Sequence, residues 1–223
     1  METTLSGSGS SGKVSLKKVL LVCGILSSLL YVGTDILGGM LWEGYSFAHQ
    51  AISELGAIGS PVGPLVSPFF TIYPVFVLAF GVGVWGSVGR NRALRVTGGL
   101  LIGIGLVGLA WTPFPMVLGE PVTSFANTMH SIFAGIQVFL TLLAIGFGAV
   151  AYRNWFRFYS IGTILTLLVA GVVAFWLAAA QGGIAPPQWF GLIERINVYG
   201  YLLWMAVLAI VLLHPEKGPT GRH

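Results

Sequence analysis

The stretch VLLVCGILSSLLYVGTDILGGMLW, residues 19–42, decides the fold class. A helix needs about 20 apolar residues to cross the hydrocarbon core of a bilayer, and this stretch is long enough, with Asp35 as its single charged residue. Its apolar residues follow one another without the strict alternation that a barrel strand requires. Since only helices and closed barrels satisfy their backbone groups in lipid, the stretch predicts a membrane-spanning helix.

The composition of the whole chain agrees with this interpretation. Of 223 residues, 55% are hydrophobic and 8% are charged, and the mean hydropathy is +0.87. A soluble domain has about 25% charged residues, so this chain has too few charges to cover a surface that faces water. We therefore expect the lipid bilayer to be its main partner. The formal net charge of +4 is then a matter of membrane topology and does not indicate nucleic-acid binding.

Apolar runs of spanning length occur six times along the chain. Within the third run, Gly99 and Gly103 are four residues apart, a spacing that predicts a close helix–helix contact. The predicted fold class is all-α, an integral membrane bundle of six transmembrane helices. The predicted spans are 19–42, 66–88, 96–114, 127–151, 158–180 and 190–213.

The basic residues orient the predicted bundle. With six spans and the N-terminus inside, ten of the eleven Lys and Arg residues fall on the inner side, and only Arg195 falls on the outer side. Cytoplasmic segments carry an excess of Lys and Arg, so we expect a multi-pass protein of the cell membrane with both termini cytoplasmic. The predicted parts are a flexible basic tail over 1–18, the transmembrane domain over 19–213 and a short cytoplasmic tail over 214–223.

The first outer loop, YSFAHQAISELGAIGSP (45–61), gathers polar side chains in an otherwise apolar chain. His49 and Ser53 are four residues apart and share one face of a helix, while Gln50 and Glu54 share the neighbouring face. Apolar residues at helical spacing predict a short interfacial helix here: Tyr45, Ala48, Ile52 and Leu55. Such a helix either faces water with its polar groups or closes a cavity at the outer end of the bundle.

Other polar residues are predicted at the same outer end. Asp35 lies in the outer half of the first span. A charge at mid-membrane costs about 2.5–3.5 kcal/mol, so a charged residue within a span normally faces a partner or a water-filled cavity. His130 opens the fourth span, and Glu194 and Arg195 open the sixth. A salt bridge from Arg195 to Glu54 or Asp35 would lower the cost of burying the guanidinium group.

These motifs resemble a known family. The stretch ISELGAIGSP, a histidine at the start of the fourth span and GLIERI before the last span are similar to a prokaryotic six-helix membrane family, catalogued as domain of unknown function 998. The resemblance covers about residues 18–213. It implies a six-helix bundle with a shared outer site that includes Ser53, Glu54, His130 and Arg195. It supplies no reaction.

One function that the outer residues allow is a membrane-embedded hydrolase or transferase acting on a lipid-like substrate. Its catalytic groups would be Ser53, Glu54, His130 and Arg195, with Asp35 as a further polar group. A catalytic zinc site needs about three protein ligands, which His49, His130 and Glu194 would supply. A Ser53–His49 nucleophile pair is an alternative, although the chain has no G-x-S-x-G elbow around this serine.

Two other classes of function stay open. A polar outer vestibule above apolar helices suits an amphiphile-binding or transport protein, although no internal repeat indicates a coupled transporter. A structural membrane subunit without catalysis would need only helix packing. A haem held between His49 and His130 is a weaker alternative cofactor than zinc, because no second histidine pair exists to pass electrons across the membrane.

Overall fold

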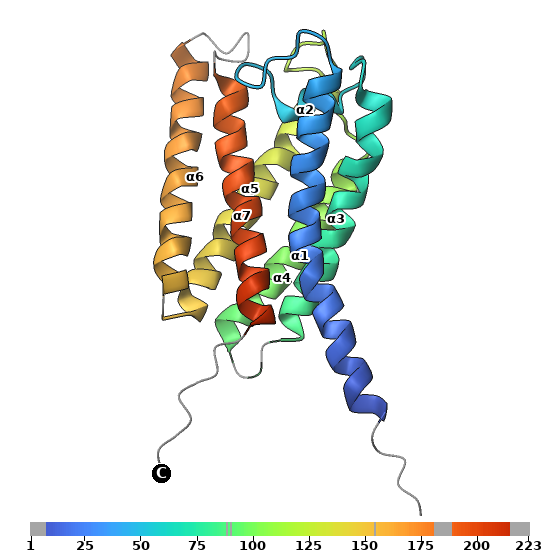
Figure 1. Ribbon diagram of the computed structural model, residues 1–223. Coiled ribbons are helices and arrows are strands. Elements are labelled where there is room, and N and C mark those ends of the chain that lie inside the picture. The colour runs from blue at the N-terminus through green and yellow to red at the C-terminus, as the bar shows by residue number, and fades with distance from the viewer. Residues whose placement is uncertain (1–7, 88, 90, 154, 181–188, 215–223) are drawn as a thin grey trace, which may run out of the picture.

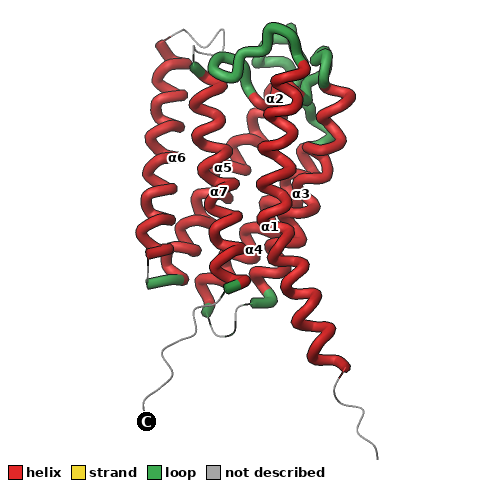
Figure 2. The backbone as a smooth tube through the Cα atoms, in the orientation of Figure 1, coloured by secondary structure: helices red, strands yellow, loops and turns green. Residues whose placement is uncertain are grey.

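The computed structural model describes residues 8–87, 89, 91–153, 155–180 and 189–214. In these residues the chain folds into six long helices and one short one (Figures 1 and 2). The six long helices are each long and apolar enough to cross a membrane, so the prediction of an all-α, multi-pass membrane protein is confirmed. The helices are α1 (Ser8–Leu41), α2 (Ile52–Leu55), α3 (Gly63–Trp85), α4 (Arg92–Trp111), α5 (Phe125–Ala151), α6 (Trp155–Ala180) and α7 (Phe190–Leu213).

The last five predicted spans agree with the observed helices to within four residues at each end. The first predicted span, 19–42, agrees with the part of α1 that is apolar enough to cross a membrane, Leu16–Leu41, although the helix itself begins earlier, at Ser8. Once the membrane-embedded part of a helix exists, each further residue adds a hydrogen bond without a new nucleation cost. Lys17 and Lys18 are also good helix formers. The helix therefore extends into the Gly/Ser-rich segment that the sequence predicts to be flexible.

The long helices form a closed ring in the order α1, α3, α4, α5, α6, α7, and α7 packs back against α1. Figure 1 shows α1 between α7 and α3, with the short helix α2 beneath the loops at one end of the ring. We call this the capped end. The helices α1 and α4 begin at the opposite end, where α5 also meets α6 through a short turn. We call it the basic end, because its described cations include Lys17, Lys18, Arg92, Arg95, Arg153 and Arg157.

Helices α3 and α4 share the most extensive contact in the ring, and glycines make their approach possible. A Cβ atom on Gly98 would lie 2.7 Å from the backbone nitrogen of Trp85, and one on Gly105 would lie 2.7 Å from the Cβ atom of Leu78. The sequence correctly predicts a close contact for this helix and one of its glycines, because a Cβ atom on Gly99 would lie 2.9 Å from the Trp85 ring of α3. A Cβ atom on Gly103 would face Leu140 of α5 at a comfortable 3.9 Å.

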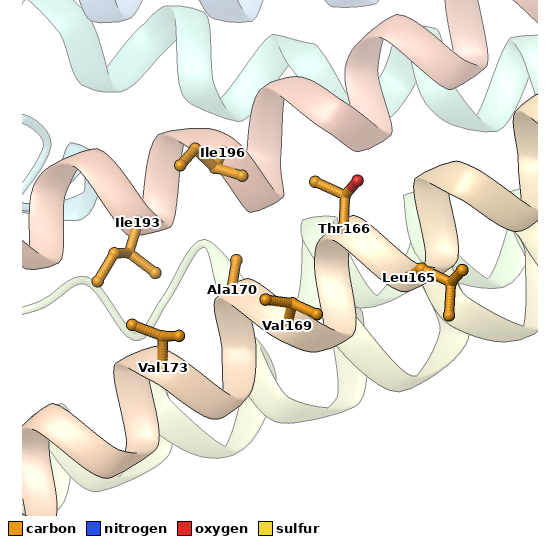
Figure 3. A pocket seen from close by; sticks show the side chains of 7 residues that line it. All are labelled: Leu165, Thr166, Val169, Ala170, Val173, Ile193 and Ile196. Carbon is orange, nitrogen blue, oxygen red and sulfur yellow. The ribbon is translucent and has the colours of Figure 1, made fainter.

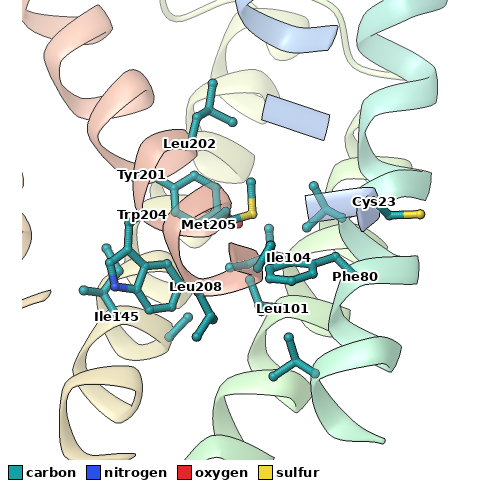
Figure 4. Close-up of a cluster of buried hydrophobic side chains, with 14 of the residues drawn as sticks. Cys23, Phe80, Leu101, Ile104, Ile145, Tyr201, Leu202, Trp204, Met205 and Leu208 are labelled. Carbon is teal, nitrogen blue, oxygen red and sulfur yellow. The ribbon is translucent and has the colours of Figure 1, made fainter. Parts of the chain in front are cut away.

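Side chains fill the centre of the ring. Figure 4 shows Phe80, Leu101, Ile104, Trp204 and Met205 meeting between the helices, and each is fully buried. Large apolar side chains that point away from the ring are exposed instead, as a surface that faces lipid requires. On α6 these include Val172 and Trp176, with 67% and 66% of their surface exposed.

Candidate functional site at the capped end

The loop over residues 45–61 is a folded cap and not the single interfacial helix that the sequence predicts. Helix α2 covers only Ile52–Leu55, and residues 47–50 form a turn. Gln50 holds the turn: its Oε1 accepts from the Ser46 backbone N–H at 2.9 Å, and its Nε2 donates to Glu54 at 3.1 Å. Glu54 also accepts from the Ala51 backbone N–H at 2.9 Å, as a capping residue does.

Arg195 explains why the helix does not start earlier. Its Nη1 donates to the carbonyl oxygens of Phe47 at 2.7 Å and Gln50 at 3.0 Å. A continuous helix through this loop would use both oxygens for its own i→i+4 hydrogen bonds. The guanidinium group thus holds the loop in a turn against α7, and Ile52 and Leu55 are buried beneath it, where they pack with Val62 and Val66.

The same arginine forms a buried ion pair with Asp35 of α1. Arg195 Nε donates to Asp35 Oδ2 at 2.9 Å, and Nη2 donates to Oδ1 at 2.7 Å. The geometry is bidentate, the strongest arrangement for this pair, and both residues are buried. Of the two partners that the sequence allows for Arg195, Asp35 is confirmed and Glu54 is not bonded to it. The expectation that Asp35 faces a partner is also confirmed.

Two tyrosines that the sequence analysis did not single out as polar groups complete this ion-pair site. Tyr199 donates its hydroxyl to Asp35 Oδ2 at 2.5 Å, and Arg195 Nη2 donates to the Tyr45 hydroxyl at 2.8 Å. Tyr199 lies one helical turn after Arg195 on α7, so the i,i+4 spacing was a usable signal. Tyr45 had no such signal, because its position depends on how the loop folds back over the ring.

Tyr45 also connects the ion-pair site to the start of α2. Its hydroxyl donates to the Ala51 carbonyl oxygen at 2.8 Å. Burial raises the pKa of the Tyr45 phenol to about 12, although the hydrogen bond from Arg195 and its positive charge act in the opposite direction. The phenol therefore stays protonated through neutral pH and keeps its donor. The guanidinium group lies 5.0 Å from the Phe47 ring centroid, which adds a cation–π contact.

Glu194 binds the loop beside Arg195. Its Oε2 accepts from the Ile52 backbone N–H at 2.6 Å, one of the donors that a helix leaves unsatisfied at its start. A Cβ atom on Gly191, one turn earlier on α7, would clash with the carbonyl oxygens of Gln50 and Phe47. The first turn of α7 therefore holds the loop by charge, by hydrogen bonds and by close backbone contact.

His49 lies at the exposed rim of the cap and is not part of the ion-pair site. Its Nδ1 accepts from the Trp189 backbone N–H at 3.3 Å, and the two rings are 5.2 Å apart. The sequence predicts that His49 and Ser53 share one face of a helix. This prediction is wrong, because His49 precedes α2 and only Ser53 lies in it. In the described part of the chain, Ser53 forms no hydrogen bond with His49, and the two do not make a nucleophile–base pair.

His130 lies in another part of the capped end, between α4 and α5. Its Nδ1 is 3.0 Å from the indole Nε1 of Trp111 and 3.2 Å from the Phe114 carbonyl oxygen. The ring is therefore held by the loop that joins these helices. Asn127 anchors the same loop, since its Oδ1 accepts from the Val117 backbone N–H at 2.8 Å.

The predicted zinc ligands are not brought together. Among the described residues, no group of three or more His, Cys, Asp or Glu side chains lies close enough to hold a metal ion. His49 contacts Trp189, His130 contacts Trp111, and Glu194 binds the start of α2. The same separation places His49 and His130 on different elements, away from the facing arrangement that a bis-histidine haem needs.

An apolar groove runs between α6 and α7 near the capped end (Figure 3). Its volume is about 470 Å³, and it opens to the outside of the ring, because Leu165, Val169 and Val173 are exposed. Thr166 supplies the one hydroxyl of the lining, and that group already donates to the Gly162 carbonyl oxygen at 3.0 Å. The other lining residues are Leu165, Val169, Ala170 and Val173 of α6 and Ile193 and Ile196 of α7.

A comparison with known protein families finds a match. A family model described as "Protein of unknown function (DUF998)" matches residues 25–211. The matched range includes most of α1, all the other helices up to the last turn of α7, and the whole cap. No curated protein and no solved structure matches the chain.

Proposed function

The chain belongs to the DUF998 family, and we propose that it is a lipid-binding membrane protein that holds a hydrocarbon chain in the groove between α6 and α7. The observation that carries this proposal is the position of the groove beside the cap. Its α7 wall begins at Ile193, which is one turn from Trp189 and donates its backbone N–H to the Trp189 carbonyl oxygen at 3.0 Å. An apolar site thus ends where polar groups begin.

This arrangement suits an amphiphile. The hydrocarbon chain would lie against Val169, Val173 and Ile196, and the hydroxyl of Thr166 in the lining already donates to the Gly162 carbonyl oxygen. The polar head would rest at the exposed rim formed by His49 and Trp189, whose rings pack against each other. Aromatic residues with one apolar and one polar side favour the depth at which lipid head groups lie.

Binding is proposed in preference to catalysis because the strongest polar groups are already engaged with each other. Arg195 donates through Nε, Nη1 and Nη2 to oxygens of the protein itself. Asp35 accepts from Arg195 and Tyr199. A catalytic group has to reach substrate in the transition state, whereas these groups are arranged to hold the cap in place.

The proposal also includes an orientation. Because described Lys and Arg residues other than Arg195 lie at the basic end, that end would face the cytoplasm of the cell in which the protein resides. The cap and the groove would then face the outer leaflet of the cell membrane, and the bound amphiphile would come from that leaflet.

The test is photo-crosslinking in nanodiscs with a phosphatidylcholine that carries a diazirine at the end of one acyl chain. We expect labelled peptides to come mainly from the groove, and a Val169→Trp variant, which fills it, to lose at least half of that label. Val172→Trp is the matched control, because Val172 is an exposed α6 residue outside the groove lining. Equal labelling of both variants, or uniform labelling around the ring, would disprove the proposal.

A further inference from the structure

The basic end carries a second cluster of charge, which the proposed function does not use. Arg92 lies in the first turn of α4, Arg153 lies in the turn between α5 and α6, and Arg157 lies in the first turn of α6. We call these three residues the arginine corner. All three are exposed.

A hydrogen bond brings the segments of the arginine corner together. The Asn91 side-chain Nδ2 donates to the Ala151 carbonyl oxygen at 2.9 Å, although the two residues are 60 positions apart in the sequence. Arg92 follows Asn91 directly, and Arg153 is two residues beyond Ala151. Asn91 also caps α4 by accepting from the Leu94 backbone N–H at 3.1 Å, so the start of α4 is fixed against the end of α5.

The charges of the arginine corner have no acidic partner in the described part of the chain, where the salt bridge is that of Arg195 with Asp35. The described acidic residues are Asp35, Glu43, Glu54, Glu120 and Glu194, and they belong to the capped end. Trp155 lies between Arg153 and Arg157 in the sequence and has 53% of its surface exposed. An exposed tryptophan at a helix start marks the depth of the lipid head groups.

We propose that the arginine corner binds the phosphate of an anionic phospholipid from the leaflet at the basic end. Arginine binds phosphate oxygens with paired N–H donors, and basic residues from adjacent helices at this depth meet head groups directly. The hydrogen bond from Asn91 to Ala151 joins the segments that carry Arg92 and Arg153, and Arg157 follows in the first turn of α6, whereas Lys17 and Lys18 lie on α1. This site is independent of the α6–α7 groove.

Native mass spectrometry of the full chain in detergent, titrated with phosphatidylglycerol or phosphatidylcholine, tests the proposal. We expect phosphatidylglycerol to bind at least tenfold more tightly than phosphatidylcholine to the wild type. The triple variant Arg92→Gln, Arg153→Gln, Arg157→Gln should lose this preference, because each basic residue near an anionic head group contributes to affinity. Lys17→Gln, Lys18→Gln is the control with exposed cations removed elsewhere on the same end, and it should retain the preference.

Three results would overturn the proposal. The triple variant keeps the preference for phosphatidylglycerol, the control loses as much of it as the triple variant does, or inorganic phosphate at millimolar concentration displaces the lipid as effectively as phosphatidylglycerol vesicles do. The last result would identify a site for a free anion. None of these outcomes depends on crosslinking in the α6–α7 groove, so failure here and failure of the proposed function are distinguishable.

Discussion

Arginine side chains have opposite environments at the two ends of the ring. At the capped end, Arg195 is buried and donates to Asp35, Tyr45 and backbone oxygens. At the basic end, Arg92, Arg153 and Arg157 are exposed and form no salt bridge within the described residues. Inside a low-dielectric region an unpaired charge is costly, whereas at the membrane surface water and lipid head groups solvate it. Arginine therefore holds helices and loop together at the capped end, whereas at the basic end it carries a charge that is solvated from outside the protein.

The largest loss of stability is expected from breaking the ion pair between Arg195 and Asp35. Replacement Arg195→Met leaves the Asp35 carboxylate buried without its partner, a change that costs about 3–5 kcal/mol. We expect a large loss of folded protein and, for what remains, a much lower unfolding midpoint in detergent titrated with sodium dodecyl sulfate.

The double variant Asp35→Asn, Arg195→Met distinguishes the cost of an unpaired carboxylate from the cost of losing the packing and hydrogen bonds of the arginine side chain. Because it removes both charges, it should recover a large part of the stability that Arg195→Met loses. If the single variant were as stable as the wild type, or the double variant were no better than the single one, the ion pair would not be what holds the cap.

A smaller loss of stability is expected from disturbing the close backbone contact beside this ion pair. Gly191→Ala places a methyl group against the carbonyl oxygens of Gln50 and Phe47, and such overpacking costs about 1–3 kcal/mol. The expected result is a lower unfolding midpoint and faster proteolysis within residues 45–61. Gly162→Ala is the matched control, because a Cβ atom there meets nothing within 4 Å. If both alanine variants behaved alike, the contact between the loop and α7 would not matter for stability.

The smallest effect is expected at the basic end. In detergent without anionic lipid, Arg153→Gln or Arg157→Gln should change the free energy of unfolding by no more than about 0.5 kcal/mol, as exposed substitutions usually do. The same denaturation measurement checks it. A loss comparable to that of Arg195→Met would mean that these arginines have partners inside the protein, and the contrast between the two ends would fail.

Much of the fold was predictable because lipid imposes a simple rule on sequence. Six apolar runs gave six helices, and one carboxyl group in the first run had to have a partner, since burial without one is costly. The alternation of the helices across the membrane then placed Arg195 at the same end as Asp35. These inferences need only the order of apolar and charged residues along the chain, which a single sequence contains.

The candidate site was predictable only in part, because its geometry depends on which helices are neighbours. Nothing in the order of the runs says that α7 packs against α1, and this contact decides that Arg195 binds Asp35 and not Glu54. The turn at residues 47–50 was also missed. Its carbonyl oxygens bind a side chain about 145 residues away, an interaction that overrides the local helical periodicity.

The ion pair between the first and last spans also constrains the order of assembly. Asp35 and Arg195 are 160 residues apart, and synthesis delivers the N-terminal part of a chain first. The carboxyl group of α1 is therefore synthesised long before its partner. Its pairing with Arg195 requires α7, so a chain truncated before α7 would leave the Asp35 carboxyl group without this partner.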